Sequence, residues 1–411
     1  MLTAVADVNT SVANDDTSAQ QNHTAEAARA WTATILTTAA YTRFGQTSID
    51  IIDAIKSKKT QFELDPDLID ANGYPILSGR IENLDTGDVM AQFEQFTQAH
   101  TLPEQNWQVE DVRSITLAHN VCLDLGLSLI ANPHLYDIII SHQNKKQNTP
   151  VTMPTIYLTC LLPASWTEPQ KQHVTLWLIS LLTTQGFPHD CIMPHPLNPF
   201  NLDDPLLTID KINIQINQQV ESGLHFIIAS HSFIGEQAIT AIADKQNKHR
   251  KVPGEAAAGL IMCNLQWAEK LALPSAVKVH RLAQLKRDKS ADAGGKIKPD
   301  TLVKAMEDAL KIANIEAADI NDITSDSDDR PTRIGELYEA INIVLPEIDV
   351  STNCIQIPVH CGEIGTVAGL LAVAAAADQV KENQQAVLCV CNNDGVTRSA
   401  IILNITNTDQ K

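Results

Sequence analysis

Apolar runs and helical periodicities alternate along most of the chain. Residues 31–41 form a continuous run of apolar, small and β-branched residues, which predicts a buried strand. Isoleucines at three-residue spacing follow it, and Thr47 or Ser48 can cap the helix that they predict. The same succession of strand and helix recurs through both halves of the sequence. Such alternation predicts a parallel-type α/β sheet covered by helices on both faces, and its recurrence predicts a duplicated, layered architecture.

The expected elements can be placed along the whole chain. Strands are predicted over 31–41, 155–163, 224–232, 250–265, 275–285, 320–325, 354–359, 385–394 and 397–405. Helices are predicted over 112–130, 173–186, 206–222, 300–315, 331–345 and 363–380. We expect a disordered tail over 1–28, an N-terminal half with loop insertions over 29–272 and a C-terminal half over 273–411.

Charge and composition narrow the classes of function. The 411 residues include 49 acidic and 30 basic side chains, and the net charge of -19 argues against a general nucleic-acid or anionic-membrane surface. The first 28 residues contain no Lys or Arg and are too polar for a signal peptide, and no run is long enough for a membrane helix. We therefore expect a cytoplasmic protein.

Cysteine spacing and glycine motifs give no indication of a cofactor. The eight cysteines lie scattered through apolar segments without any CxxC pair, so reduced, mostly buried thiols are expected rather than disulfides or a metal site. Neither GxGxxG nor GxxxxGK occurs, so nucleotide binding is unsupported. No cofactor and no metal are expected.

One basic segment stands out in an otherwise acidic chain. It is a candidate docking site for an anionic partner, and a solvated surface is the alternative interpretation. Its residues are Lys245, Lys248, Arg250, Lys251, Arg281, Lys286 and Arg287.

Several motifs in the second half resemble a known family. PGEAAAGLIM begins at Pro253, GELYEAI at Gly335, CGEIGTVAGLLAV at Cys361 and NNDGVTRSAIIL at Asn392. In this order and spacing they resemble the late motifs of the β-ketoacyl synthases, members of the thiolase-like superfamily. The resemblance implies a duplicated αβαβα layered fold, a homodimer, and a catalytic cysteine assisted by two histidines that together perform acyl transfer and condensation. It also implies an acyl carrier protein or an intact synthase as the partner that would dock at the basic segment.

The three catalytic positions of that family hold other residues here. The resemblance places Leu206 at the cysteine position, and Asp326 and Glu363 at the two histidine positions. Leucine cannot accept an acyl group, and carboxylates cannot donate hydrogen bonds to an oxyanion as imidazoles do. We therefore predict a degenerate, non-condensing protein, a pseudoenzyme that acts as a binding or scaffold partner in acyl, fatty-acid or polyketide-type metabolism.

An enzymatic alternative stays open at this point. The chain can be an acyltransferase of the 3-oxoacyl synthase type that uses Cys361 or Cys191 as nucleophile, or an acid-base pair of Asp326 and Glu363, one of which then has a raised pKa. The non-catalytic interpretation is that Glu363 is an acid in the first turn of a helix, favoured by the helix dipole, and that Asp326 is a solvated acid. His360 and Cys361, as neighbours on a strand, are expected to face opposite sides. The candidate pocket comprises Leu206, His231, Asp326, His360, Cys361 and Glu363.

Overall fold

The structure is a computed structural model. It describes residues 27–70, 72–144, 153–195, 204–218, 222–244, 251–273 and 276–405, with the side chains of 241–244 left out. All but the last two residues of the expected tail over 1–28, and residues 245–250 of the basic segment, lie outside the described residues.

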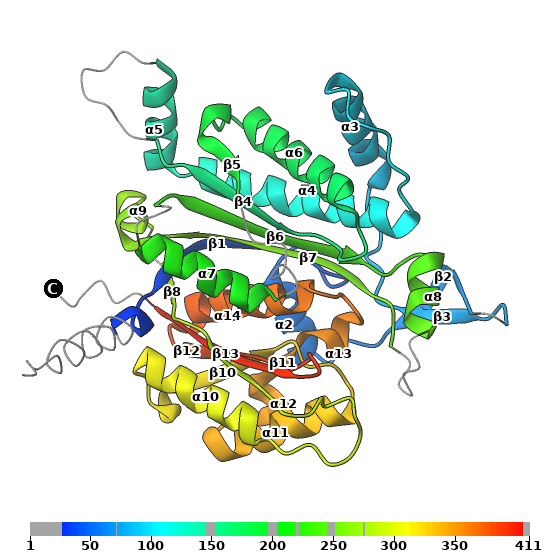
Figure 1. The fold of residues 1–411 in the computed structure, drawn as a ribbon, viewed down its shortest axis with the longest axis vertical. Coiled ribbons are helices and arrows are strands. Elements are labelled where there is room, and N and C mark those ends of the chain that lie inside the picture. Colours follow the sequence, from blue (N-terminus) through cyan, green and yellow to red (C-terminus); the bar gives the residue numbers. More distant parts are fainter. Residues whose placement is uncertain are drawn as a thin grey trace, which may run out of the picture.

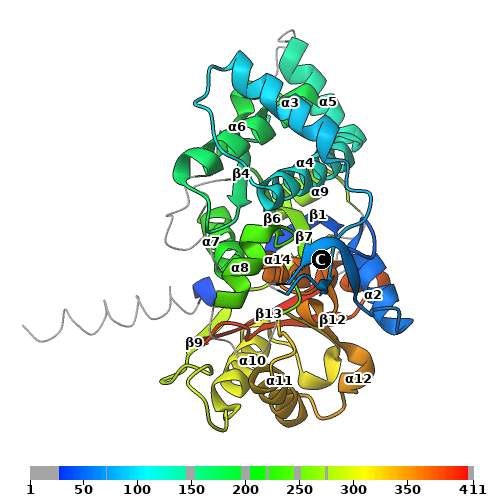
Figure 2. The same cartoon turned by 90° about the vertical axis from the view of Figure 1, so that its right-hand side faces the viewer.

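Helices and strands stack in five layers, helical at the top, centre and bottom and β-sheet in between (Figure 1). The same succession is visible at right angles to that view (Figure 2). The helices of the three helical layers are α4 (Val109–Ile130) and α6 (Glu168–Thr184), then α7 (Pro205–Asn217) and α14 (Val367–Asn383), then α10 (Asp300–Ala313) and α11 (Pro331–Val344). The predicted αβαβα layering is therefore confirmed.

Both halves of the chain use one strand order. The strands of the first half are β1 (Ala33–Tyr41), β4 (Ile156–Leu161), β5 (Ile192–Pro194), β6 (Leu224–Ser232) and β7 (Glu255–Cys263). Those of the second half are β8 (Val277–Val279), β10 (Ile320–Ser325), β11 (Cys354–Gln356), β12 (Ala386–Cys391) and β13 (Thr397–Ile405). Across the sheet the first half has the order β5-β4-β6-β7-β1, and the second half has the order β11-β10-β12-β13-β8. When the five strands of each half are numbered 1 to 5 in chain order, both orders are 3-2-4-5-1.

Strand directions repeat as well. In each half the second strand is parallel to the third and fourth, whereas the fifth is antiparallel to the fourth and to the first. The predicted duplication is thus present in the topology and not only in the layering.

The two halves are joined through β8. This strand pairs with β1, where Val277 lies opposite Ile35, and with β13, where Val279 lies opposite Leu403. A short strand, β9 (Ala283–Lys286), pairs with β13 as well. In the described part of the chain the ten strands given above and β9 therefore form one continuous sheet that folds around the central helices, while β2 and β3 pair in a separate two-stranded sheet.

The position of α14 explains why its first three turns are apolar on every side. Residues 367–377 pack between the two layers of strands and are buried on all faces, whereas the last turn of the helix reaches solvent. Its Leu370 belongs to the same buried cluster as Ile35 of β1, Leu206 of α7 and Ile401 of β13. The outer helix α10 is instead amphipathic, and buries Leu302 and Met306.

Loops and small elements complete the described chain. They are α2 (Ser48–Lys56), β2 (Glu63–Ile69), β3 (Pro75–Ser78), α3 (Thr86–Ala99), α5 (Pro133–Asn144), η1 (His189–Cys191), α8 (Glu236–Asp244), α9 (Leu265–Lys270), η3 (Ala317–Asp319), α12 (Val350–Asn353) and α13 (Ile357–Cys361). Among the described helices, none is by itself long and apolar enough to cross a membrane, although the sharply bent pair α4 and α5 reaches that length and composition together.

Three element predictions near the C-terminus were wrong. The strand expected over 354–359 ends at Gln356, because Pro358 occupies the first turn of a short helix, α13. The helix expected over 363–380 runs instead from Val367 to Asn383, since positive φ angles at Gly362 and Gly365 keep the intervening segment out of helical geometry. The strand expected over 275–285 is divided between β8 and β9.

Candidate functional site

The first turns of α7 and α14 lie against each other at the position that the sequence singled out. Asp204 caps α7 by accepting a hydrogen bond from the Leu207 amide at 3.1 Å. Gly369 permits the contact, because a Cβ atom there would lie 3.3 Å from Pro205 Cγ and 3.5 Å from Leu206 Cδ1. The Leu206 side chain is fully buried in the central core and offers no reactive atom.

The loop before α14 is fastened to the chain that enters β7. The Glu363 amide donates to the Val252 carbonyl at 2.8 Å, and the Gly254 amide donates to the Glu363 carbonyl at 3.1 Å. No residue with a side chain fits at position 254, because a Cβ there would collide with the carbonyl oxygen of Cys361. The backbone of Glu363 is therefore fixed before its side chain is considered.

The Glu363 carboxylate is held on two sides. One oxygen accepts a hydrogen bond from the Lys251 ammonium, and the other accepts from the Gly365 amide at 3.3 Å. Lys251 Nζ also lies 3.8 Å from Asp328 Oδ2, so one cation links two acids from different loops. Glu363 precedes α14 and is not in its first turn, so the expectation of a first-turn helix acid was wrong.

Asp326 follows β10 and holds the turn between β12 and β13. Its Oδ1 accepts hydrogen bonds from the amides of Asn392 at 2.8 Å and Asn393 at 3.2 Å. Burial raises the pKa of Asp326 to about 6, against the lowering effect of those hydrogen bonds and of one with Cys391. The nearby Asp204 adds a smaller rise in the same pKa.

The acidic loop after Asp326 is not a set of solvated acids. Asp328 is buried, and both of its carboxylate oxygens accept hydrogen bonds from Arg330 Nε, at 2.9 and 2.8 Å. Arg333 is directed elsewhere, to the Asn393 carbonyl at 3.0 Å and to Asp292 at 2.8 Å. Arg330 neutralises this loop, and Glu363 pairs with Lys251 rather than with Arg333.

His231 is brought next to Glu363. It lies near the end of β6, and its ring packs against Gly365, where a Cβ atom would collide with Nδ1. Phe233 stacks on the ring with 4.2 Å between centroids. Burial lowers the pKa of His231 to about 4, although the Glu363 charge opposes that shift. The imidazole is therefore neutral at physiological pH.

His360 and Cys361 lie on the short helix α13 rather than on a strand, so the argument from strand geometry does not apply to them. Burial lowers the pKa of His360 to about 4, and the Arg43 guanidinium lowers it further. Burial raises the pKa of the Cys361 thiol to about 12, although Arg43 favours the thiolate. A thiol with such a pKa is not a nucleophile at neutral pH. Cys191 lies in another part of the fold, beside β5.

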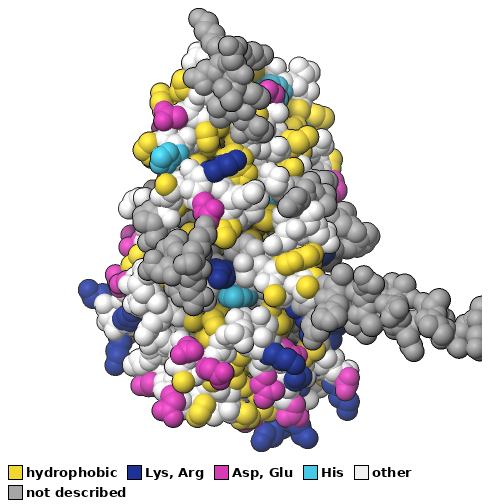
Figure 3. Space-filling model, turned by 90° about the vertical axis from the view of Figure 1, so that its left-hand side faces the viewer, with side chains coloured by type: hydrophobic (Ala, Val, Ile, Leu, Met, Phe, Trp, Pro, Cys, Tyr) yellow, Lys and Arg dark blue, Asp and Glu magenta, His cyan; other side chains and the backbone are white. Residues whose placement is uncertain are grey.

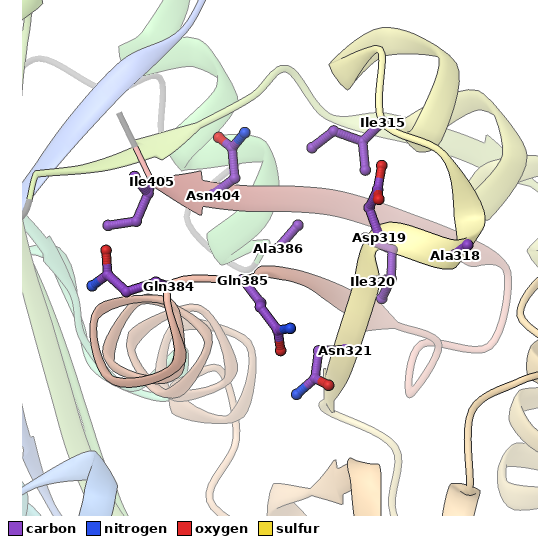
Figure 4. Close-up of a pocket in the computed structure, with 10 residues that line it drawn as sticks. All are labelled: Ile315, Ala318, Asp319, Ile320, Asn321, Gln384, Gln385, Ala386, Asn404 and Ile405. Carbon is purple, nitrogen blue, oxygen red and sulfur yellow. The ribbon is translucent and has the colours of Figure 1, made fainter. Parts of the chain in front are cut away.

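The cavity beside Glu363 has a volume of about 30 Å³, which holds no more than about one water molecule. Its lining residues are Phe62, Lys251, Val252, Asp328, Asp329, Pro358, Val359, Gly362 and Glu363. A hollow of about 400 Å³ lies at the opposite ends of β10 and β12 and is lined mainly by uncharged side chains (Figure 4). Its residues are Ile315, Ala318, Asp319, Ile320, Asn321, Gln384, Gln385, Ala386, Asn404 and Ile405.

The basic segment does not present its charges together. Lys251 pairs with Glu363, Arg281 with Asp210 at 2.6 Å, and Arg287 with Glu336 at 2.5 Å. Lys286 is exposed, whereas Lys245, Lys248 and Arg250 lie outside the described residues. One face of the molecule shows Lys and Arg interspersed with Asp and Glu over its lower part (Figure 3). Lys251, Arg281 and Arg287 are therefore each paired with an acid of this chain, and docking at this segment stays a prediction.

Comparison with solved structures defines the class of fold. The ishigamide ketosynthase/chain length factor shares 11% identity at a TM-score of 0.59, over 92% of this chain and 100% of that chain. The ketosynthase from module 6 of the bacillaene synthase of Bacillus subtilis 168 shares 9% identity at a TM-score of 0.63, over 92% of this chain and 72% of that one. A β-ketoacyl synthase from Burkholderia phymatum STM815 shares 12% identity at a TM-score of 0.59, over 92% and 100%.

These similarities give the fold, which is that of the thiolase-like ketosynthases. No protein-family model matches the chain, and no curated protein matches it in sequence.

Sequence reasoning missed the partner of Glu363. Lys251 appeared only as one member of a basic segment, and 112 residues separate it from the acid with which it pairs. No spacing rule could have joined them. The PGEAAAG motif that follows Lys251 was the available signal, because its Gly254 fixes the loop that carries Glu363.

Proposed function

We propose that this chain is a ketosynthase-fold protein that does not condense acyl groups and acts by binding. Its partner would be an active synthase or an acyl carrier protein of fatty-acid or polyketide-type metabolism. The ion pair between Glu363 and Lys251 carries this proposal. A carboxylate engaged by a cation and a backbone amide has no free proton donor for an oxyanion and no free base for a substrate.

The space around the pair supports the same proposal. Leu206 fills the first turn of α7 with a side chain that cannot attack a thioester. A cavity of about 30 Å³ beside Glu363 leaves no room for an acyl chain. A filled centre favours a role carried by the outer surface of the protein.

The names of structural neighbours indicate which partners to test. One neighbour is a ketosynthase/chain length factor. Another is AntDE:AntF, a type II polyketide synthase acyl-carrier protein in complex with its ketosynthase, with 10% identity and a TM-score of 0.53 over 92% of this chain and 100% of that chain. An acyl carrier protein and a second ketosynthase-fold chain, including a second copy in a homodimer, are therefore the first partners to examine. Cytoplasmic location stays a prediction.

Asp326 supports a second candidate, an acyltransferase or another acid-base catalyst. Its pKa of about 6 leaves part of the population protonated near neutral pH, as a general acid requires. Against this stand the two backbone amides that engage its carboxylate and the raised pKa of Cys361, the nearest candidate nucleophile in sequence to Glu363.

Intact-mass measurement separates the two candidates. The protein is incubated with acyl-thioesters and malonyl carrier protein, beside an active ketosynthase as positive control. The binding proposal predicts no acyl adduct and no condensation product. A stable adduct on the wild type that is lost in Cys361→Ser or Cys191→Ser would refute the binding proposal and support the enzymatic one.

Direct binding is measured separately, by titrating labelled apo, holo and acylated carrier proteins and following fluorescence anisotropy. We expect saturable binding that weakens with added salt, because carrier recognition depends on charge complementarity. If no carrier form binds and light scattering gives only a monomeric mass, neither an acyl carrier protein nor a second copy of this chain is a partner.

A further inference from the structure

Three side chains that can ligate a metal meet at the edge of the first half, away from the site described above. They are His142 in the last turn of α5, and Asp190 and Cys191 in the η1 turn that leads into β5. Figure 1 shows α5 standing out at the upper end of the molecule. His142 and Cys191 are partly buried, whereas Asp190 is exposed.

The separations of the ligand atoms fit one small ion. His142 Nε2 lies 3.6 Å from Asp190 Oδ2 and 3.8 Å from Cys191 Sγ, and that sulfur lies 3.9 Å from Asp190 Oδ1. Tetrahedral zinc, with Zn–S of about 2.3 Å and Zn–N or Zn–O of about 2.1 Å, requires edges of about 3.4 to 3.6 Å. The two distances from His142 Nε2 exceed those edges by only about 0.2 Å. The Cys191 distance is to the other Asp190 oxygen, and with one ligand atom taken from each residue all three atoms lie within 4.8 Å of one another, so side-chain rotations must bring them together around one ion.

The backbone preorganises the three ligands. Asp190 and Cys191 are adjacent in a helical turn closed by the hydrogen bond from the Cys191 amide to the Pro188 carbonyl at 3.0 Å. The helix and the turn are also joined by Gln143 Nε2, which donates to the Gly186 carbonyl at 3.3 Å. The ligands therefore come from two segments that already touch.

We propose that His142, Asp190 and Cys191 bind one Zn²⁺ ion, which ties α5 to the segment that enters β5. An imidazole and a thiolate together select zinc over magnesium or calcium, which prefer oxygen ligands. Three protein ligands leave the fourth tetrahedral position to solvent, on the side where the Asp190 carboxylate is exposed.

Binding displaces the proton of the thiol, which gives the proposal a pH signature. Burial and the neighbouring carboxylate raise the pKa of Cys191 in the free protein. Zn²⁺ therefore competes with this proton for the Cys191 sulfur, and binding releases the proton.

The experiment uses the full chain stripped with chelator and dialysed into metal-free buffer. Calorimetric titration with ZnCl₂ is expected to give one site per chain, with release of a proton. Co²⁺ is expected to produce a thiolate-to-metal absorption band in the near ultraviolet. Cys191→Ser should remove that band and lower the Zn²⁺ affinity by at least about 10 to 100-fold, with His142→Gln and Asp190→Asn also weakening it.

Matched controls separate this site from adventitious binding. His134→Gln alters an exposed histidine of the same helix outside the cluster, and Cys354→Ser alters a partly buried cysteine of the other half. Both should keep wild-type affinity and the cobalt band. Circular dichroism checks that each variant is folded. The proposal is overturned if the wild type shows no saturable 1:1 binding, or if folded Cys191→Ser binds Zn²⁺ as tightly as Cys354→Ser does.

Discussion

The Lys251 ammonium stands between the carboxylates of Glu363 and Asp328, and all three side chains are mostly shielded from solvent. Removing one partner from such a set leaves a poorly solvated charge, which costs more than the pair itself contributes. The sequence indicated that Glu363 was unusual, because an acid stood between two glycines. The ion pair of Glu363 could not be predicted from the sequence, because Lys251 lies on a loop 112 residues away.

A double-mutant cycle measures this coupling. Glu363→Gln and Lys251→Met should each lower the free energy of unfolding by about 1 to 3 kcal/mol, because each substitution leaves the remaining charge shielded from solvent without its partner. The double variant should lose less than the sum, with a coupling energy of about 0.5 to 3 kcal/mol in urea denaturation at pH 7. As control, Asp308→Asn breaks the exposed Lys304–Asp308 pair of α10 and should leave stability nearly unchanged. Strict additivity would show that the two charges do not interact.

Asp326 gives a pH-dependent contribution of predictable sign. Its folded pKa of about 6 lies above the ordinary aspartate value of 3.8, so the native state binds the proton more tightly than the unfolded chain does. The contribution is fully present below about pH 4 and is lost as the pH rises through about 6. Measured against Asp326→Asn, which keeps a side-chain acceptor for the Asn392 and Asn393 amides, the wild type should therefore become relatively less stable between pH 4 and pH 7. A difference that grows in the opposite direction would show that the hydrogen bonds outweigh burial.

At the scale of elements, close backbone approach decides where the loop before α14 can lie. Gly254 and Gly79 each face the carbonyl oxygen of Cys361 at a separation that leaves no space for a Cβ. The apolar pattern predicted that a strand and a buried helix occur here, as β11 and α14 show, but it carried the strand into the segment that forms α13. It also began the helix too early, at Glu363 rather than Val367, because the positive φ angles of Gly362 and Gly365 depend on the contacts that the loop makes.

Two glycine-to-alanine substitutions test this difference. Gly254→Ala should lower the free energy of unfolding by about 1 to 3 kcal/mol, because its methyl group meets backbone rather than a movable side chain. Gly335→Ala lies within α11 with no atom near the added carbon, and should raise stability by about 0.5 to 1 kcal/mol through helix propensity. Chemical denaturation measures the free energy of unfolding of both variants and of the wild type. Equal effects would show that the approach to Cys361 is not tight.

At the scale of the whole molecule, the two halves share a sheet and a core. Strand β8 pairs with strands of both halves, and the central cluster combines Leu206 of the first half with Leu370 of the second. The alternation of strands and helices was sufficient to predict layers and duplication. It could not predict that the sheet is continuous, because β8 has only three residues and its pairing on both edges is purely tertiary.

The shared sheet predicts a single cooperative unfolding transition. Separating residues 29–272 from 273–411 would expose the apolar faces of α7 and α14, so neither half should fold alone. Differential scanning calorimetry of the full chain should show one peak, and each half expressed alone should lack the near-ultraviolet circular dichroism of a packed core. Two resolved peaks would show that the halves are independent domains.

The link between Lys251 and Glu363 has an evolutionary consequence if the protein is non-condensing. A single substitution that placed histidine at position 363 would leave the ammonium of Lys251 beside a neutral ring, with Asp328 at 3.8 Å as its remaining acid. A histidine at this position would therefore need a compensating change at Lys251, which comes from a loop 112 residues away.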